Sequence, residues 1–238
     1  MQIFNNSDHN KFIKHFKIWN WPSEIDNNFF NKSYKYINYI KWIPWLKMIW
    51  IWNSVSMFNS NKESDIDLFI VTSKNRIWFV RILITFIFTI LWERKTKNKH
   101  AWKFCLSFFC NDDKMNFYSF ALDNDIYLYF WVIYLKPILD FDNTYNKFIN
   151  SQSWADFWKY QNIINSNKKF IKYTWKSIWI NFKLFDLIDY LFKKVFLPKT
   201  IKHFYDLKKP YWIIINDNIL KFHNNDKRKQ IIKLFYKK

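Results

Sequence analysis

The stretch Trp50–Val71, WIWNSVSMFNSNKESDIDLFIV, decides which fold the chain can adopt. Its two ends are apolar, and the polar residues between them are rich in Asn and Ser. Apolar runs of about four to eight residues, bounded by such turn-forming residues, are typical of buried strands. We therefore predict strands at Leu46–Ile51 and Asp65–Val71, joined by a turn region, residues 53–64, with room for a short helix.

Asp65 and Asp67 are the residues of this stretch with the clearest chemical meaning. Side chains two residues apart on a strand point to the same face, so the two carboxylates project together while Ile66 and Leu68 point into the core. Two neighbouring carboxylates repel each other unless a cation lies between them, and Mg²⁺ prefers carboxylate and phosphate oxygens. An exposed acidic edge of a sheet is the alternative interpretation. The strongly apolar strand favours the metal site, because an unneutralised buried pair would be costly.

Together with the preceding turn, these carboxylates resemble a known signature. The sequence runs Asn53-Ser54, ten residues, and then Asp65-Ile66-Asp67-Leu68. This is similar to the signature of the DNA polymerase β-like nucleotidyltransferase superfamily, in which a hydrophobic residue, Gly, and Gly or Ser precede a hydrophobic-flanked D-x-D at a similar distance. Ser54 fits the Gly/Ser position, and Asn53 stands where the family usually has glycine. The resemblance covers the middle of the chain, residues 40–140.

The resemblance implies a Mg²⁺-dependent nucleotidyltransferase. Such an enzyme transfers a nucleoside monophosphate from a nucleoside triphosphate (NTP) to an acceptor hydroxyl and releases pyrophosphate. By this resemblance, Asp65 and Asp67 would be the catalytic metal ligands, for one or two Mg²⁺ ions, and Asn53 and Ser54 would bind the nucleotide. The acceptor stays open, and an RNA end, a small molecule and a protein side chain are all compatible with it.

The family usually has a third carboxylate on a neighbouring strand, and its place in this chain is not evident. The strand expected at Phe104–Cys110 offers only Ser107 as a polar residue apart from its cysteines. Asp112 and Asp113 follow just past its end. Two interpretations remain: one of these two residues serves, or the chain is a catalytically degenerate relative that binds nucleotide or RNA.

The rest of the chain predicts an α/β (α+β) fold, with a small mixed sheet flanked by helices and a mainly helical C-terminal half. We divide it into N-terminal helices at 1–39, a nucleotidyltransferase-like core at 40–145 and a basic, mainly α-helical region at 146–238. The polar stretch Asp140–Ser153 indicates a linker. Helices are expected at His9–Lys17, Ser23–Tyr39, Arg76–Leu91 and 123–139, and from Ser153 to about Lys172.

The chain is strongly basic, with 38 Lys and Arg against 19 Asp and Glu and a formal net charge of +19. A polyanionic partner, nucleic acid or an anionic membrane surface, is one interpretation. An A+T-rich genome is the other, because nearly all basic residues are Lys while Asn and Ile are abundant. The apolar run Ile82–Trp92 is shorter than the roughly 20 residues of a membrane span. We therefore expect a buried helix there, with a peripheral membrane protein as a less favoured alternative.

Cysteine and histidine usage indicates a cytoplasmic protein without structural zinc. Cys105 and Cys110 lie in one apolar run, where nearby positions do not easily meet disulfide geometry. The five histidines are scattered and form no cluster with the cysteines. The start of the sequence, Met1–Asn10, is polar and does not have the pattern of a signal peptide.

The chain has no glycine and 15 tryptophans. At a usual frequency of about 7%, roughly 17 glycines are expected. Taken literally, their absence rules out a Walker A loop and a dinucleotide-binding fingerprint. The UGA codon encodes glycine in some lineages and tryptophan in a common variant code, so we hypothesise that several of these tryptophans are glycines in the native protein. Trp45, Trp92 and Trp212 lie in contexts that favour glycine, and Trp52, beside Asn53, is the position that matters most to the site.

Overall fold

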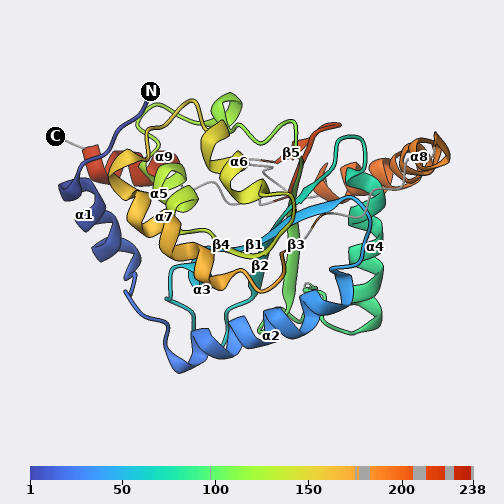
Figure 1. Ribbon diagram of the computed structural model, residues 1–238, viewed down its shortest axis with the longest axis horizontal. Helices are drawn as coiled ribbons and strands as arrows, with labels where there is room; N and C mark the ends of the chain where they lie inside the picture. The colour runs from blue at the N-terminus through green and yellow to red at the C-terminus, as the bar shows by residue number, and fades with distance from the viewer. Residues whose placement is uncertain (97, 175, 177–182, 206–212, 223–227, 237–238) are drawn as a thin grey trace.

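The structure is a computed structural model that describes residues 1–96, 98–174, 176, 183–205, 213–222 and 228–236 (Figure 1). Its centre is a six-stranded sheet in the order β4-β1-β2-β3-β6-β5. Strands β2 and β3 are parallel, whereas the other neighbours are antiparallel, and this mixed sheet with flanking helices confirms the predicted α/β fold. The strands are β1 (Leu46–Trp52), β2 (Ile66–Thr72), β3 (Phe104–Asn111), β4 (Lys136–Asp140), β5 (Ile214–Ile215) and β6 (Ile219–Lys221).

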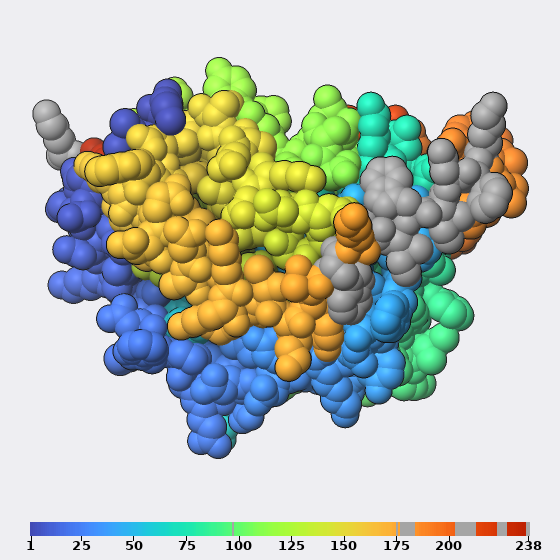
Figure 2. Space-filling model, viewed as in Figure 1, coloured from blue at the N-terminus to red at the C-terminus, as the bar shows by residue number. Residues whose placement is uncertain are grey.

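Helices cover both faces of the sheet, and each face has its own hydrophobic core (Figure 1). Phe69 and Val71 of β2 belong to the core shared with α1, α5, α6, α7 and α9, whereas Leu68 and Ile70 belong to the core shared with α2, α4 and α8. The yellow-to-orange part of the chain, which includes α6 and α7, lies across the middle of the face seen in Figure 2. The helices are α1 (Asn6–Phe16), α2 (Glu24–Ile40), α3 (Asn53–Ser56), α4 (Ile77–Ile90), α5 (Ile126–Tyr134), α6 (Thr144–Ser151), α7 (Gln161–Asn167), α8 (Lys183–Tyr205) and α9 (Arg228–Tyr236).

The predicted strand–turn–strand unit is confirmed. Every residue of β1 and β2 is buried, the two strands pair antiparallel with Trp52 opposite Asp67, and α3 occupies the turn that follows β1. The chain then crosses over through α4 and returns in β3, parallel to β2. Because of these directions, the end of β1 and the beginnings of β2 and β3 meet at one edge of the sheet.

Two expectations about the segment after β3 are wrong. The helix expected over residues 123–139 ends at Tyr134, and Lys136–Asp140 forms the edge strand β4. Pro137 disfavours helical backbone at the residue before it and is tolerated in a strand only at a sheet edge, which is where it lies. The linker expected at Asp140–Ser153 is the helix α6 instead, because the aromatic residues within this polar stretch pack into the core.

The C-terminal region contributes to the same sheet as the middle of the chain. Although most of its described residues after 146 are helical, β6 pairs with β3, and β5 pairs with β6. Helix α4, which contains most of the apolar run Ile82–Trp92, buries Ile84 and Phe88 and exposes Phe86 and Ile90. None of the described helices is both long enough and apolar enough to cross a membrane.

Three tryptophans in the described part of the chain have left-handed backbone, the conformation for which glycine is the usual residue. The φ angles are 63° at Trp45, 57° at Trp92 and 62° at Trp102. Positive φ is a genuine outlier for a bulky side chain. These angles support the hypothesis of native glycine at two of the three positions named from sequence context, and the third, Trp212, lies outside the described residues. Trp52 gives no such support, because its φ of −136° is extended backbone that suits any residue.

Trp92 has the clearest glycine-like position. It directly follows the C-cap of α4, and its N–H donates to the carbonyl of Thr89 at 3.1 Å, while Glu93 N–H donates to the carbonyl of Phe88 at 2.9 Å. These two bonds form a Schellman motif, in which glycine is the usual residue at the position that Trp92 occupies. The Trp92 side chain is 81% exposed and therefore contributes little packing in return.

Replacing Trp92 with glycine should therefore stabilise the protein. Removing a side chain from left-handed backbone relieves about 1 kcal/mol, which corresponds to a rise in Tm of about 2–4 °C for a chain of this size. Thermal unfolding of Trp92→Gly measures this effect. The matched control is Trp158→Gly, because Trp158 is also exposed (75%) but does not have positive φ, and it should give no gain. Equal destabilisation by both substitutions would contradict the backbone argument.

Candidate active site

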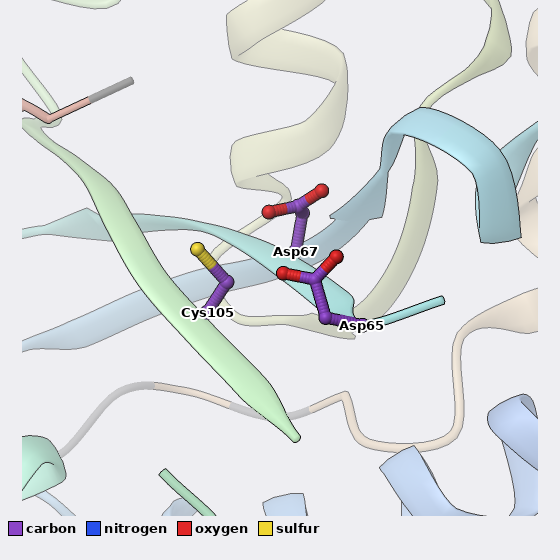
Figure 3. Close-up of side chains that lie close together, drawn as sticks. All are labelled: Asp65, Asp67 and Cys105. Atoms are coloured by element: carbon purple, nitrogen blue, oxygen red, sulfur yellow. The ribbon is translucent and has the colours of Figure 1, made fainter. Parts of the chain in front are cut away.

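Asp65 and Asp67 lie at the edge of the sheet where β1, β2 and β3 come together. Asp67 is the second residue of β2 and is only 6% exposed, whereas Asp65 directly precedes the strand and is half-buried. Their carboxylates lie close together, as the alternation of side chains along a strand requires (Figure 3). The structure therefore brings together the two carboxylates that the sequence motif singled out.

The turn after β1 contacts this carboxylate pair through Asn53. Asn53 has left-handed backbone with φ of 59°, and its side-chain Nδ2 donates to Asp67 Oδ2 at 2.7 Å. Asparagine tolerates this backbone better than other residues with a Cβ, so Asn53 takes the glycine-like position of the motif. The question of glycine at position 52 loses its importance for the site, because Trp52 is extended. Ser54 follows in the first turn of α3 and is half-buried.

Cys105 completes the cluster, and it is the residue that sequence reasoning missed. In the parallel pair of β2 and β3, Cys105 lies directly opposite Asp67. One ligand atom from each of Asp65, Asp67 and Cys105 lies within 4.8 Å of the others (Figure 3). The register of β3 against β2 was the missing information, because Cys105 carries no charge to mark it in the sequence.

Asp112 and Asp113 lie too far from the cluster to supply the third carboxylate, so the interpretation in which one of them serves is wrong. They lie at the opposite end of β3, seven residues or more beyond Cys105, and a strand rises about 3.3 Å per residue, which places them more than about 20 Å away. Asp112 instead accepts a hydrogen bond from the backbone N–H of Lys74 at 3.0 Å, and Asp113 pairs with the Lys74 ammonium at 3.4 Å. Both acidic residues therefore lie at the opposite ends of the strands from Asp65 and Asp67.

Lys95 places a positive charge beside the cluster. Its Nζ lies 2.5 Å from Asp65 Oδ2, and its backbone N–H donates to the carbonyl of Phe104 at 2.9 Å. Burial on its own would lower the pKa of Lys95, but its electrostatic interactions with Cys105 and with the carboxylates of Asp65 and Asp67 outweigh burial and raise the pKa. The ammonium thus partly balances the carboxylates in the absence of another cation.

Burial dominates the electrostatics of the cluster. It raises the pKa of Asp67, against the hydrogen bonds from Asn53 and Cys105 and the charge of Lys95. Burial and the neighbouring Asp67 also raise the pKa of Asp65, against its ion pair with Lys95. Burial and the charge of Asp67 raise the pKa of the Cys105 thiol well above its usual value, so Cys105 is a neutral thiol at neutral pH.

The donor set fits a hard divalent cation held by two carboxylates. Mg²⁺ is usually bound through one or two protein carboxylates together with substrate phosphates and waters, and Asp65 and Asp67 provide that number. A protonated thiol is a poor ligand, and a thiolate would favour softer metals. The cluster therefore offers two carboxylates that could hold one hard divalent cation, with the Cys105 sulfur close by.

Comparison of the chain with protein-family models, with curated proteins and with solved structures finds no match. The chemical interpretation of this cluster therefore depends on its own residues and geometry.

The raised pKa of the buried Asp67 predicts how the free energy of unfolding depends on pH. A carboxyl whose pKa is raised by folding destabilises the folded state at high pH, and this cost disappears as pH falls towards the ordinary value near 4. Asp67→Asn should therefore increase the free energy of unfolding at pH 7, by an amount on the order of 1 kcal/mol, and the gain should shrink between pH 7 and pH 4. Urea unfolding at several pH values measures it.

Added Mg²⁺ should reverse the order of stability of the wild-type chain and Asp67→Asn. Cation binding to the folded state stabilises it by mass action, so the wild-type chain should gain stability with Mg²⁺ and Asp67→Asn should not. If Asp67→Asn is less stable than wild type at pH 7 and responds equally to Mg²⁺, then Asp67 is a structural residue and not part of a cation site.

Proposed function

We propose that this chain is a Mg²⁺-dependent nucleotidyltransferase that uses Asp65 and Asp67 to bind the metal complex of a nucleoside triphosphate. The observation that carries the proposal is the contact between Asn53, in the left-handed turn after β1, and the buried Asp67 on the antiparallel neighbour β2. This contact joins the two halves of the nucleotidyltransferase-like motif in space. A buried and a half-buried carboxylate side by side are suited to a cation that also binds phosphate oxygens.

Each residue of the cluster has a definite part in this proposal. Asp65 and Asp67 would hold the metal, and Asn53 fixes the orientation of Asp67 through its side-chain amide. Bound Mg²⁺ would supply neutralisation of the phosphate charge that develops during transfer. Lys95 would release Asp65 when the metal binds, which leaves a free ammonium beside the reacting phosphates.

The transfer itself forms one bond and breaks one. The acceptor oxygen bonds to the α-phosphorus of the triphosphate, the bond from that phosphorus to the bridging oxygen breaks, and pyrophosphate leaves. The proton of the acceptor hydroxyl passes to water, because the Cys105 thiol is already protonated at neutral pH and cannot accept it. Catalysis would then consist mainly of positioning and charge neutralisation.

A catalytically degenerate nucleotide- or RNA-binding relative is the second candidate, and Cys105 is the observation that favours it. Cys105 lies opposite Asp67, at the place on the neighbouring strand where a third carboxylate would be expected from the resemblance. A neutral thiol there cannot serve as a general base, a function typically worth about 10²–10⁴-fold in rate.

Transfer of labelled nucleotide tests the first candidate. The purified chain is incubated with each α-labelled NTP, Mg²⁺ and a mixture of hydroxyl-bearing acceptors, and protein-dependent transfer products and pyrophosphate are measured. Asp65→Asn and Asp67→Asn should each reduce transfer by about 100-fold or more, because each removes a direct charge contact with the metal. Asp113→Asn removes an exposed carboxylate at the far end of β3 and is the matched control. Normal transfer by either cluster variant, with the fold intact, would contradict the assignment.

Substitution of Cys105 separates the two candidates. Cys105→Asp restores a carboxylate opposite Asp67 and should raise the transfer rate by about 10-fold or more if the missing base limits catalysis. Cys105→Asn has a similar size without the charge, and it should leave the rate close to wild type. Two results would contradict the view that Cys105 replaces a catalytic carboxylate. One is a lower transfer rate in Cys105→Asp than in wild type, and the other is an equal increase in rate in Cys105→Asp and Cys105→Asn.

A further inference from the structure

A cavity of about 390 Å³ opens beside the candidate active site, on the far side of Cys105. Strand β6 pairs with β3 only along Phe108–Cys110, so the beginning of β3 is not covered by β6. The cavity lies against this uncovered part, between β3, α4 and α8. Cys105, which belongs to the carboxylate cluster, and Lys95, which pairs with Asp65, both line the cavity, so the cavity and the cluster are neighbours.

The polar lining of this cavity is cationic. Among the described residues that line it, none is acidic, and the polar lining comes mainly from Arg81, Arg94, Lys95, Lys199, Ser107 and Thr200. Lys95 is paired with Asp65, whereas no carboxylate of the described residues pairs with the other three cations. Several cations in one recess, without a carboxylate partner in the described part of the chain, are suited to an anionic ligand.

Arg81 is the most strongly fixed of these cations. Its guanidinium lies 5.1 Å from the ring centre of Trp78 and 4.8 Å from that of Phe222, so two aromatic rings hold it in place. Burial, together with the charge of Arg94, lowers its pKa to about 10. A half-buried guanidinium has lost part of its hydration. An anionic ligand that contacts Arg81 would replace the lost water contacts and stabilise its charge.

The order of the strands separates this cavity from the turn that contacts the carboxylates. Strand β1, which leads into Asn53 and Ser54, lies on one side of β2, whereas β3 and the cavity lie on the other side. Asp65 and Asp67 are between the two. A transfer reaction between two substrates needs two binding regions, one on each side of the metal ligands.

We propose that the cavity binds the acceptor, and that the acceptor is a small molecule with a phosphate group near the hydroxyl that is modified. This inference depends on the proposed nucleotidyltransferase function, with the nucleotide on the Asn53 side. Two Arg and two Lys match the multiple oxygens of a phosphate better than a single carboxylate. The volume is in the range of small-molecule pockets and too small for a folded RNA.

Calorimetry with defined probes tests the inference. Inorganic phosphate, glycerol 3-phosphate and uncharged glycerol are titrated into the full chain without metal or nucleotide, and MgATP binding is measured separately. Both phosphate compounds should bind and glycerol should not. Arg81→Gln and Lys199→Gln should each weaken phosphate binding by about 10-fold or more, with less than a two-fold change in the Kd of MgATP.

The matched control is Lys194→Gln. Lys194 is an exposed lysine on the same helix as Lys199, but it does not line the cavity, and its replacement should change neither affinity. Lys199 is also exposed, so Lys199→Gln keeps the test valid if the partly buried Arg81 variant fails to fold.

The remaining outcomes show whether the ligand assigned to the cavity or the proposed nucleotidyltransferase function is wrong. Loss of MgATP binding in Arg81→Gln would overturn the inference, because the cavity would then hold the triphosphate. Displacement of phosphate by single-stranded RNA at much lower concentration than by glycerol 3-phosphate would overturn the small-molecule assignment. MgATP binding without any phosphate binding would overturn the cavity assignment and leave the function standing. Arg81-dependent phosphate binding without MgATP binding would support a phosphate site and overturn the nucleotidyltransferase.

Discussion

The burial of the Asp67 carboxylate is the constraint on which the arrangement of the site depends. A carboxylate inside a sheet is tolerated only when hydrogen-bond donors or a cation surround it. Here Asn53 donates from the turn after β1, the Cys105 thiol hydrogen-bonds from β3, and Lys95 adds a positive charge nearby. Both neighbouring strands thus direct a polar group to the same point, which fixes how the three strands meet at this edge.

The same arrangement leaves the carboxylates incompletely compensated. The pKa values of Asp65 and Asp67 are raised, mainly by burial, so their ionised forms reduce the stability of the folded chain at neutral pH. Functional sites commonly carry such a cost, because the ligand removes it on binding. The ion pair of Lys95 with Asp65 partly takes the place of a divalent cation. If the proposals above hold, the cationic cavity beyond Cys105 would bind the phosphate of the acceptor.

Much of the site was predictable because its signals are local. The two-residue period of a strand places Asp65 and Asp67 together, and the Asn-Ser pair after an apolar run indicates a turn. Local signals also explain the capping of α2, where Ser23 accepts from the backbone N–H of Asp26 at 3.1 Å as expected for an N-cap.

What the sequence could not predict depends on pairing between distant segments. Asp112 and Asp113 were candidates because they carry charge and directly follow the expected strand, whereas the register of β3 places Cys105 beside Asp67. Lys95 reaches Asp65 from the segment after α4, a contact that no spacing rule describes. The strand β4 was mistaken for the end of a helix, because a short apolar run has the same composition in a buried helix and in a strand until its pairing partner is known.

Electron paramagnetic resonance of Mn²⁺, in the presence of a non-hydrolysable ATP analogue, tests whether Asp67 holds the metal complex of a triphosphate. Mn²⁺ favours the same carboxylate and phosphate ligands as Mg²⁺. The wild-type chain should bind Mn²⁺ much more tightly with the analogue than without it, and Asp67→Asn should abolish this nucleotide-dependent binding. Equal Mn²⁺ binding by the wild-type chain and Asp67→Asn, with or without the analogue, would contradict this role of Asp67.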